Sequence, residues 1–592
     1  MKLALGLALV CACGSPVFAD LRYDTEIKGV DDSDLSSLLD DVSQLKKLED
    51  NKPASEEALR RRADADLDRL KDAAHSLGYW NAQFTYDVDA TSDPAKVTVT
   101  ATPGPLYHVE AITVLGPGGA PLAVPVAAPL PMKMGDPART EPVVATENAL
   151  LAALGQAGYP FAKKTDRKVV IDHATQTMAV TYTLDPGAPM RFGLATITGL
   201  ERLDPSYVQN RIQWRPDAAY DNRAVNETRK RLIESGLFST VKITPVPDPG
   251  DPGHVRMDID ATERAHRTIG VGAAYNTSEG AGARVFWENR NLFGNAESLL
   301  VNVDGGQQRD AVAAKFRKPD FLAVDQDLLV AAEVANDTPV AYDSRRAALS
   351  AGLERRFDPH LTGSAAISIE KANVTALADT GPFTTAQRSQ HYALVGVPLS
   401  LKYDRSDDLL NPTRGYRVQF NAVPYQSFSG PNLSFVSGRL SASTYQRLDD
   451  SDRYILAAFG AVSSLEGPSL DQIPADKRIY AGGGGSIRAY GYLMAGALDN
   501  DKKPIGGKSS VELSFEARIK ITETIGIVPF LDAGSYYDRS LPQLNERLLY
   551  GPGLGFRYYT GFGPVRLDIA TPLNRRPGDA LVQFYISLGQ AF

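Results

Sequence analysis

From residue 264 to the C-terminus, apolar and polar residues alternate with a period of two, without helical periodicity. In the stretch VELSFEARIKI (511–521) every second residue is apolar, and Glu512, Glu516 and Arg518 stand between the apolar ones. Because neighbouring side chains of a strand point to opposite faces, such stretches predict strands with one apolar and one charged face. The stretch 582–588 alternates in the same way, and the last residue is the aromatic Phe592.

Two folds produce this pattern, a soluble β-sandwich and a closed transmembrane barrel. The charged face carries large residues, the strands are long and the chain ends on an aromatic residue. These features favour a barrel with a wet interior and an apolar band that faces lipid. At about 20 residues for each strand and its turn, the 329 residues from 264 to 592 predict sixteen antiparallel strands. Counts of about twelve or fourteen strands fit the alternation too.

The first nineteen residues have the composition of a secretory signal, with Lys2 at the charged end, an apolar core and a small-residue cleavage site at 17–19. Cys11 and Cys13 both lie in this segment, so the mature chain is expected to use no disulfide, no thiolate metal site and no cysteine nucleophile. No run of about 20 apolar residues follows, so we expect no membrane helix. The net charge of −8, or −9 without Lys2, is unsuited to nucleic-acid binding.

Residues 20–263 contain a repeat of about 80 residues. An apolar-periodic helix ends in a glycine followed closely by an aromatic residue and a strand, in the stretches 70–89, 150–171 and 229–246. Gly78, Gly158 and Gly236 stand where a helix C-cap takes the left-handed conformation. Each unit therefore predicts a β-α-α-β-β domain, with boundaries at 20–104, 105–187 and 188–263, ahead of a barrel from 264 to 592. Small sheets of this kind leave edge strands that can receive an extended peptide.

The second unit departs from the repeat because five prolines crowd the position of its first helix. They are Pro117, Pro121, Pro125, Pro129 and Pro131. Since proline disfavours a helix interior, we expect that helix to be short or missing.

A glycine-rich loop stands out within the strand-forming half. It reads YAGGGGSIRAYGY over 480–492 and contains Gly482, Gly483, Gly484 and Gly485, followed by Ser486, Ile487, Arg488, Ala489 and Tyr490. Glycine in this density lets the backbone take positive φ and lie against another surface, with one arginine projecting from it. A flexible connector and a phosphate cradle are the alternatives, and the surrounding fold must decide between them.

These features together resemble the BamA/TamA superfamily of outer-membrane assembly factors. The modules are similar to POTRA domains, and the glycine-rich loop is similar to the arginine motif in the sixth extracellular loop of that family. Three further stretches are similar to family sequences: NLFGN (291–295), DRSDDLLNPTRG (404–415) and GLGFRYYTGFGPVRLDIATPL (553–573). With three modules and a barrel of this length, the chain looks most like the TamA branch.

The resemblance implies that the loop folds back into the barrel, where Arg488 meets carboxylates on lumen-facing strands. Glu516 and Asp532 are the residues that match this role. Alternatively, both are ordinary lumen charges balanced by Arg518 or Arg566. Ala489 stands where the family has glycine, which raises the question whether that position needs positive φ.

The resemblance also implies a weak seam between the first strand, expected near Thr268–Asn276, and the last, expected near Ala580–Phe592. Gly270 and Gly272 would weaken side-chain pairing there, and Gly589 would let the last strand bend before Phe592. Such a seam would help β-barrel substrates such as autotransporters to insert or cross without ATP. The implied partners are unfolded outer-membrane proteins, the lipid bilayer and a TamB-like protein anchored in the inner membrane, with the modules in the periplasm.

Three other functions remain open at this point. A two-partner secretion pore shares modules and barrel, although it generally has two modules behind a plugging helix. An enzyme is disfavoured because neither HExxH nor GxSxG occurs, and the sequence predicts no cofactor or metal site. A soluble adhesin or binding protein is the third alternative.

Overall fold

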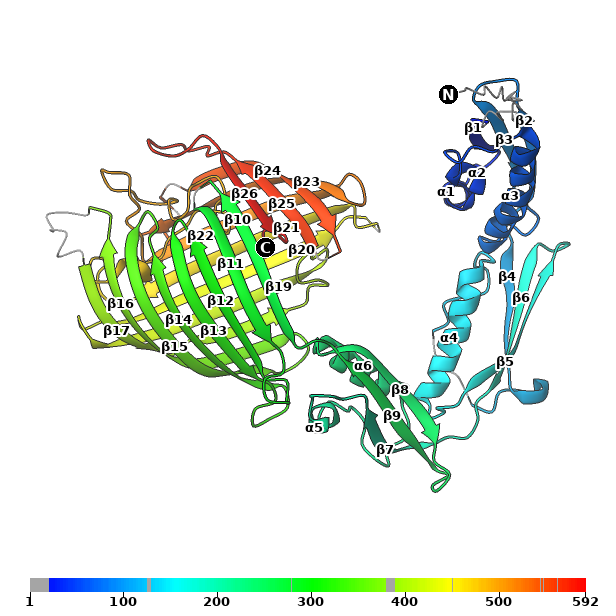
Figure 1. Cartoon of the computed structure of the whole chain (residues 1–592), viewed down its shortest axis with the longest axis horizontal. Helices are drawn as coiled ribbons and strands as arrows, with labels where there is room; N and C mark the ends of the chain where they lie inside the picture. The colour runs from blue at the N-terminus through cyan, green and yellow to red at the C-terminus, as the bar shows by residue number, and fades with distance from the viewer. Residues whose placement is uncertain are drawn as a thin grey trace, which may run out of the picture. The chain divides into compact units, whose positions relative to one another are not determined.

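The computed structural model describes residues 21–124, 129–277, 279–379, 389–449, 451–543, 545–546, 548–561 and 563–592. The expected signal segment (1–19) and Pro125 lie outside these residues. The chain forms two compact units, one dominated by the small N-terminal sheets and one by residues 261–592 (Figure 1). Among the described residues no helix combines the length and apolarity that a membrane crossing requires.

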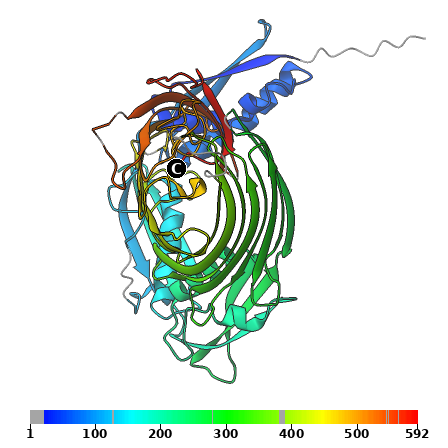
Figure 2. The same cartoon turned by 90° about the vertical axis from the view of Figure 1, so that its left-hand side faces the viewer.

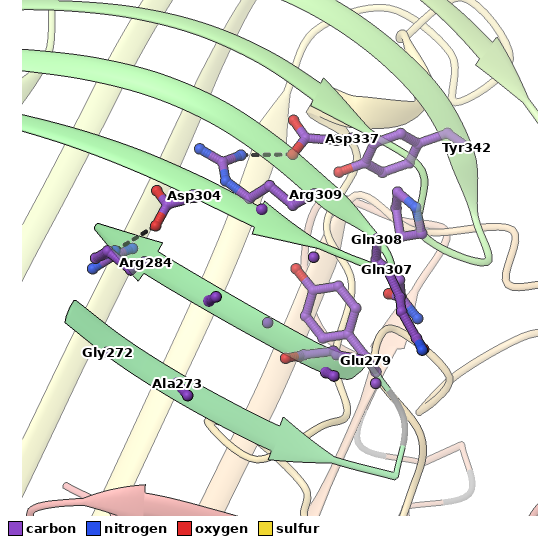
Figure 3. Close-up of a pocket in the computed structure, with 18 of the residues that line it drawn as sticks. Gly272, Ala273, Glu279, Arg284, Asp304, Gln307, Gln308, Arg309, Asp337 and Tyr342 are labelled. Atoms are coloured by element: carbon purple, nitrogen blue, oxygen red, sulfur yellow. Dashed lines mark hydrogen bonds and ion pairs between the residues drawn. The ribbon is translucent and has the colours of Figure 1, made fainter. Parts of the chain in front are cut away.

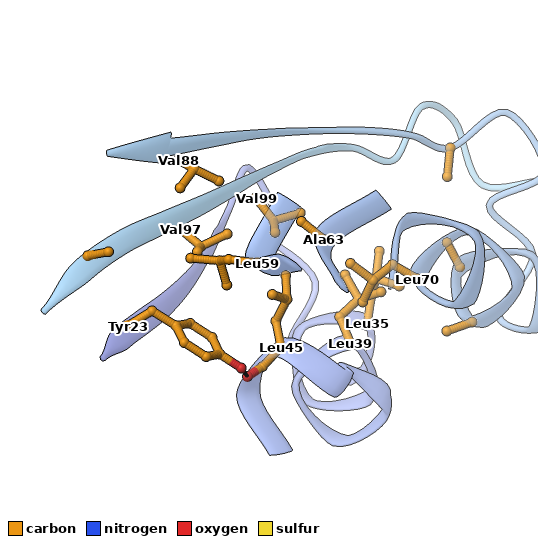
Figure 4. Packing of buried hydrophobic residues seen from close by; sticks show 14 residues of the cluster. Tyr23, Leu35, Leu39, Leu45, Leu59, Ala63, Leu70, Val88, Val97 and Val99 are labelled. Carbon is orange, nitrogen blue, oxygen red and sulfur yellow. Dashed lines mark hydrogen bonds between the residues drawn. The ribbon is translucent and has the colours of Figure 1, made fainter. Parts of the chain in front are cut away.

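The first small sheet and its helices span residues 23–102. The elements are β1 (Tyr23–Lys28), α1 (Ser33–Val42), α2 (Gln44–Lys47), α3 (Glu56–Ser76), β2 (Gln83–Asp89) and β3 (Ala95–Thr102). β3 is the central strand, parallel to β1 and antiparallel to β2. Apolar side chains from the helices, such as Leu35 and Leu59, pack on Val97 and Val99 of β3 (Figure 4). Buried Asp66 of α3 accepts hydrogen bonds from the Ser43 hydroxyl and from the backbone N–H groups of Gln44 and Leu45, which secures the start of α2.

The next two sheets repeat this strand order. The second has β4 (His108–Leu115), η1 (Pro117–Gly119), α4 (Thr140–Gln156), β5 (Lys163–Asp172) and β6 (Thr177–Asp185). The third has β7 (Arg191–Thr198), α5 (Pro205–Gln209), α6 (Asn222–Glu234), β8 (Phe238–Pro247) and β9 (His254–Glu263). The last strand of each unit is central in its sheet.

Two details of the repeat follow from proline and glycine. Gly78, Gly158 and Gly236 have φ of 100°, 103° and 71°, the left-handed geometry expected after a helix. In the described residues between β4 and α4, the proline-rich segment forms the 3-10 turn η1 and no α-helix. The β-α-α-β-β order therefore holds for the third unit and, with the additional short helix α2, for the first. The second unit lacks its first helix there, as its prolines predicted.

The second compact unit is built on a closed antiparallel barrel. Its strands are β10 (Arg267–Asn276), β11 (Gly280–Asn289), β12 (Ser298–Gly306), β13 (Arg309–Lys318), β14 (Gln326–Asp337), β15 (Tyr342–Arg356), β16 (Leu361–Ala376), β17 (Ser389–Gly396), β18 (Leu399–Asp404), β19 (Gly415–Ser429), β20 (Ser434–Arg447), β21 (Tyr454–Glu466), β22 (Ser509–Lys520), β23 (Ile525–Tyr537), β24 (Leu549–Thr560), β25 (Gly563–Ala570) and β26 (Gln583–Leu588). β17 and β18 both pair with β16 and β19, so they are one strand interrupted at Val397-Pro398. The described strands therefore occupy sixteen positions, which agrees with the predicted count.

The two faces of the wall differ as the alternation predicted. Large apolar side chains such as Val271, Phe515 and Phe556 are exposed on the outside. Charged side chains such as Glu516 and Asp532 are buried on the inside. Figure 2 looks along the barrel, with the segment that joins β21 to β22 inside the ring of strands.

Candidate functional site

The glycine-rich loop (480–492) is held in a folded-back conformation by its own backbone. Gly482 and Gly483 have φ of 105° and 98°, in the left-handed region that favours glycine. The N–H of Gly483 donates to the carbonyl of Tyr490 at 2.9 Å, and the N–H of Gly482 donates to the Ser486 hydroxyl at 3.1 Å. This compact turn presents the side chain of Arg488 to the inner wall of the barrel.

Arg488 meets three carboxylates from three strands of one part of the barrel wall, β22, β23 and β25. Its Nε and Nη2 donate to the two oxygens of Asp532 on β23, both at 2.8 Å, and its backbone N–H also donates to Asp532 at 3.0 Å. Its Nη1 donates to Glu516 on β22 at 2.8 Å and to Asp568 on β25 at 2.9 Å. The guanidinium thus binds Asp532 with the bidentate fork for which arginine is suited, and its Nη1 group connects β22 and β25 to the same arginine.

This ion cluster is shielded from solvent. Arg488 is 1% exposed and Asp532 is fully buried. The guanidinium carbon lies 3.4 Å from the centroid of the Phe530 ring, and the Ser514 hydroxyl bridges Nη2 to Asp532. Charges removed from water in this way are stable only when paired, so each member depends on the others.

The sequence missed three members of the cluster: Asp568, Ser514 and Phe530. Asp568 could have been found, because it alternates with apolar residues of β25 and must therefore face inward. Ser514 and Phe530 carried no signal, since their role depends on the position of the loop.

The alternative partners of the carboxylates are present as well. Arg518 donates to the second oxygen of Glu516 at 3.0 Å, and Arg557 donates to Asp568 at 2.6 Å. Arg566 lies 3.6 Å from Asp568. Asp532 differs from the other two carboxylates, because Arg488 is its one cationic partner among the described residues.

Alanine at position 489, where the family has glycine, causes no backbone strain. Ala489 is buried and its φ is not positive, so the position does not require glycine. The space comes from the opposite side, where a Cβ added to Gly551 of β24 would lie 2.2 Å from the Ala489 methyl. Glycine at 551 therefore compensates for alanine at 489.

The loop also touches the last strand. A Cβ on Gly484 would lie 2.7 Å from the ring of Tyr585 on β26, so only glycine allows this approach. The Tyr585 hydroxyl donates to the Tyr490 carbonyl at 3.4 Å. Buried Ile487 fills the space above Gly534 of β23, and Gly485 has open space around it. The glycine-rich loop therefore binds both the wall and one side of the closing seam.

The seam between β10 and β26 is short. The strands are in register only at Tyr275 opposite Ile586 and at Asn276 opposite Tyr585. Thr277 adds a backbone bond to Phe584 at 3.3 Å and a hydroxyl bond to Gln583 at 2.6 Å. By contrast, β10 pairs with β11 along its whole length, from Arg267 to Asn276.

The predicted last strand was too long, because β26 ends at Leu588 and not near Phe592. Gly589 has φ of 87°, its N–H donates to Pro564, and the chain leaves the wall there. Phe592 packs against the rings of Tyr445 and Phe459, and its carbonyl accepts from Arg518 at 3.3 Å. The tail thus turns inward, and the seam loses the pairing that four more residues would have supplied.

The two predicted seam glycines have different surroundings. A Cβ on Gly270 would lie 2.3 Å from the ring of Phe286, its register partner on β11, so this glycine makes room for an aromatic ring. Gly272 has open space and lines a cavity of about 710 Å³ on the inner side of β10–β15. Arg284 with Asp304 and Arg309 with Asp337 face this cavity as ion pairs (Figure 3).

The NLFGN stretch and Glu263 stabilise the turn after β7. The Asn291 amide donates to the carbonyl of Arg202 at 3.2 Å, and Asp204 N–H donates to the carbonyl of Gly294 at 2.8 Å. Burial acts to raise the pKa of the Glu263 carboxyl, but backbone N–H groups of residues 201–203 bond to it and lower that pKa overall. Among the described residues, no cluster of His, Cys, Asp and Glu could hold a metal ion.

The Omp85 superfamily domain matches residues 291–592, more than half of the chain. The chain belongs to the Omp85 superfamily. The outer membrane protein assembly factor BamA of Neisseria meningitidis serogroup B is 22% identical over 89% of this chain and 72% of its own length. The BamA of Nitratidesulfovibrio vulgaris is 22% identical over 76% of this chain and 57% of its own length, so the chain spans little more than half of that relative.

One solved structure shows the same architecture. Haemophilus ducreyi BamA lacking POTRA domains 1–3 aligns with a TM-score of 0.64 at 17% identity, over 81% of this chain and 99% of that one. CdiB from Acinetobacter baumannii aligns with a TM-score of 0.47 at 13% identity, over 82% of this chain and 90% of that one. This Omp85 protein is therefore an outer-membrane barrel with POTRA modules in the periplasm. The nearer likeness to TamA stays a prediction.

Proposed function

We propose that this Omp85 protein is an assembly and translocation factor for β-barrel substrates such as autotransporters, working through its lateral seam without ATP. The proposal rests on one observation above all: two registered residue pairs join β10 to β26, whereas β10 and β11 pair along their full length. An edge with few ladder bonds leaves N–H and C=O groups that can template an incoming strand.

The buried arginine cluster has a supporting role in this proposal. It anchors the glycine-rich loop to β22, β23 and β25, while Gly484 and Tyr490 hold Tyr585 of β26. The loop thus holds β26, one side of the seam, in place, while few hydrogen bonds join β26 to β10 on the other side. The cavity beside Gly272 would receive side chains of a strand added to β10.

Two finer parts of the proposal concern partners. The relatives are named outer membrane protein assembly factors, which supports unfolded barrels as substrates. The edge strands β2, β5 and β8 leave one side of each small sheet for an extended segment of a TamB-like protein or of a substrate. No catalytic step and no cofactor form part of the proposal.

A cross-link across the seam tests the central step. Tyr275 and Ile586 face each other in register, and the expected mature chain has no other cysteine, so Tyr275→Cys/Ile586→Cys can be oxidised selectively. We expect oxidation to stop substrate assembly in proteoliposomes and reduction to restore it. Tyr275→Cys/Ala281→Cys, which joins β10 to β11, is the matched control and should stay active when oxidised. Undiminished assembly by the oxidised seam variant would rule out lateral opening.

Ion conductance separates this role from a secretion pore. In the structure the loop fills part of the lumen and buries Arg488 against the wall. We expect low conductance from the purified barrel in planar bilayers. A large, steady conductance would favour the two-partner secretion alternative.

A further inference from the structure

Three basic side chains surround one asparagine on the outer face of the barrel. Arg345 of β15 lies opposite Asn373 of β16, and Asn373 lies opposite His391 of β17. Lys371 stands two residues before Asn373, between Ala347 and Ala393 of the neighbouring strands. We call Arg345, Lys371, Asn373 and His391 the basic cluster.

Strand alternation places this cluster on the lipid side. Ile367 and Ile369 share the parity of Lys371 and are 62% and 49% exposed, whereas the intervening Ala372 and Val374 belong to a buried cluster. On β15, Leu349 shares the parity of Arg345 and is also exposed. Since β10 enters the membrane from the periplasmic modules, the ends of β14 and β16 and the start of β15 lie on the extracellular side.

The charges of the cluster are not balanced within the part of the chain that the structure describes. Neither Arg345 nor Lys371 makes an ion pair there, whereas the inward Arg346 pairs with Glu333 at 2.6 Å. On the same face, Asp310 stands level with Arg345 but two strands away, beyond Asn336, and Asp343 lies nearer the extracellular rim. A lipid-facing cation is costly at the bilayer midplane and nearly free of cost close to the interface, so this position suits the headgroup level.

The wall is hollowed at the same place. A depression of about 860 Å³ is lined by Arg345, Lys371 and Asn373, by the smaller apolar residues Val312, Val334 and Ala347, and at its far side by the carboxylate of Asp310. Directly below it, towards the periplasm, the outer face continues with Leu349, Ile367 and Ile369. The ring nitrogen Nδ1 of His391 is 2.7 Å from the side-chain oxygen of Asn373, which turns the amide nitrogen of Asn373 away from that contact.

We propose that the basic cluster binds the phosphate of a phosphorylated glycolipid in the outer leaflet. Arg345 and Lys371 donate charge-assisted hydrogen bonds to the phosphate oxygens, and the Asn373 amide adds a neutral donor. The acyl chains lie on the apolar residues directly below. Because the cations stand directly above an apolar surface, the site suits a lipid better than free phosphate. The proposed site does not depend on the proposed function of the seam.

The test uses the full-length protein in detergent micelles and native mass spectrometry. The probes are lipid A, its dephosphorylated form and inorganic phosphate. We expect the protein to retain lipid A but neither the dephosphorylated form nor inorganic phosphate. The variant Arg345→Gln/Lys371→Gln should weaken the retention of lipid A at least about tenfold, because each lost charge-assisted hydrogen bond has that effect. Arg267→Gln/Arg355→Gln removes two exposed cations near the periplasmic ends of β10 and β15, and it should bind as the wild type does.

Equal retention by the wild type and the cluster variant overturns the proposal, as does equal binding of the dephosphorylated lipid. If inorganic phosphate, at the same concentration as lipid A, displaces lipid A from the protein, the site binds anions without selecting a lipid. This result also overturns the proposal. Unchanged heat-modifiable mobility of the barrel shows that each variant is folded. If the double variant fails this check, the single variant Lys371→Gln replaces it, with the same expected direction.

Discussion

Replacing Arg488 by alanine is the most direct test of the luminal cluster. The change removes the fork to Asp532 and both bonds of Nη1. Glu516 and Asp568 keep Arg518 and Arg557, whereas Asp532, fully buried, keeps no cation among the described residues. Breaking a buried pair by removing one partner costs about 3–5 kcal/mol, and this cost falls on the closed state of the glycine-rich loop.

Arg488→Lys separates charge from geometry. Lysine keeps the positive charge but is a point donor on a flexible stem, so it cannot reproduce the fork and the second branch together. We expect it to lose about 1.5–3 kcal/mol of loop closure, the value of one charge-assisted hydrogen bond. The order wild type, lysine, alanine is therefore the signature of a bidentate anchor.

Hydrogen exchange of peptides covering 480–492 measures loop opening. Opening that becomes easier by about 3 kcal/mol speeds exchange about 100-fold, and the lysine variant should show about a tenfold effect. Arg439→Ala is the matched control, since it breaks a 2.6 Å pair with Glu512 on the same wall without a described contact to the loop. Identical exchange in wild type and Arg488→Ala would refute the idea that this arginine anchors the loop.

Three further predictions test separate contacts. Gly551→Ala should speed exchange of the glycine-rich loop because the new methyl overlaps that of Ala489, and adding Ala489→Gly should reverse the effect. Asp66→Ala should destabilise the start of α2 by about 3 kcal/mol, since it removes the acceptor of three hydrogen bonds, whereas exposed Asp68→Ala should not; exchange in that helix distinguishes them. Because the pKa of Glu263 is lowered in the folded protein, its ionised carboxylate stabilises the turn after β7. This stabilisation is fully present at pH values above the ordinary glutamate pKa of about 4.3. That stability is lost as pH falls through the lower folded pKa, so acid should open the turn, and Glu263→Gln should abolish this pH dependence.

Much of the fold could be read from local patterns. The alternation of residues 511–521 specified which side chains face the lumen, and the glycines after the module helices specified where those helices end. The prolines from 117 to 131 predicted the missing helix of the second module. Each of these signals works over a few residues, so no long-range information was needed.

The site was only partly predictable. Glu516 and Asp532 could be named by resemblance and by their inward parity, but Asp568, Ser514 and Phe530 join the cluster through the position of the loop. The end of β26 at Leu588 was missed because the continuing alternation carried no sign of the inward turn. The reason for glycine at 551 was invisible, since its partner methyl comes from a segment some 60 residues away.

The sequence by itself determined the two-part organisation, the inner and outer faces of the strands and the choice of arginine as the projecting charge. Those properties follow from side-chain periodicity and from the conformations that glycine and proline allow. Only the tertiary structure decided which carboxylates share the guanidinium, how few bonds close the barrel and which cations stand together on its outer face. These depend on register and on strand closure, which bring residues together across hundreds of positions in the chain.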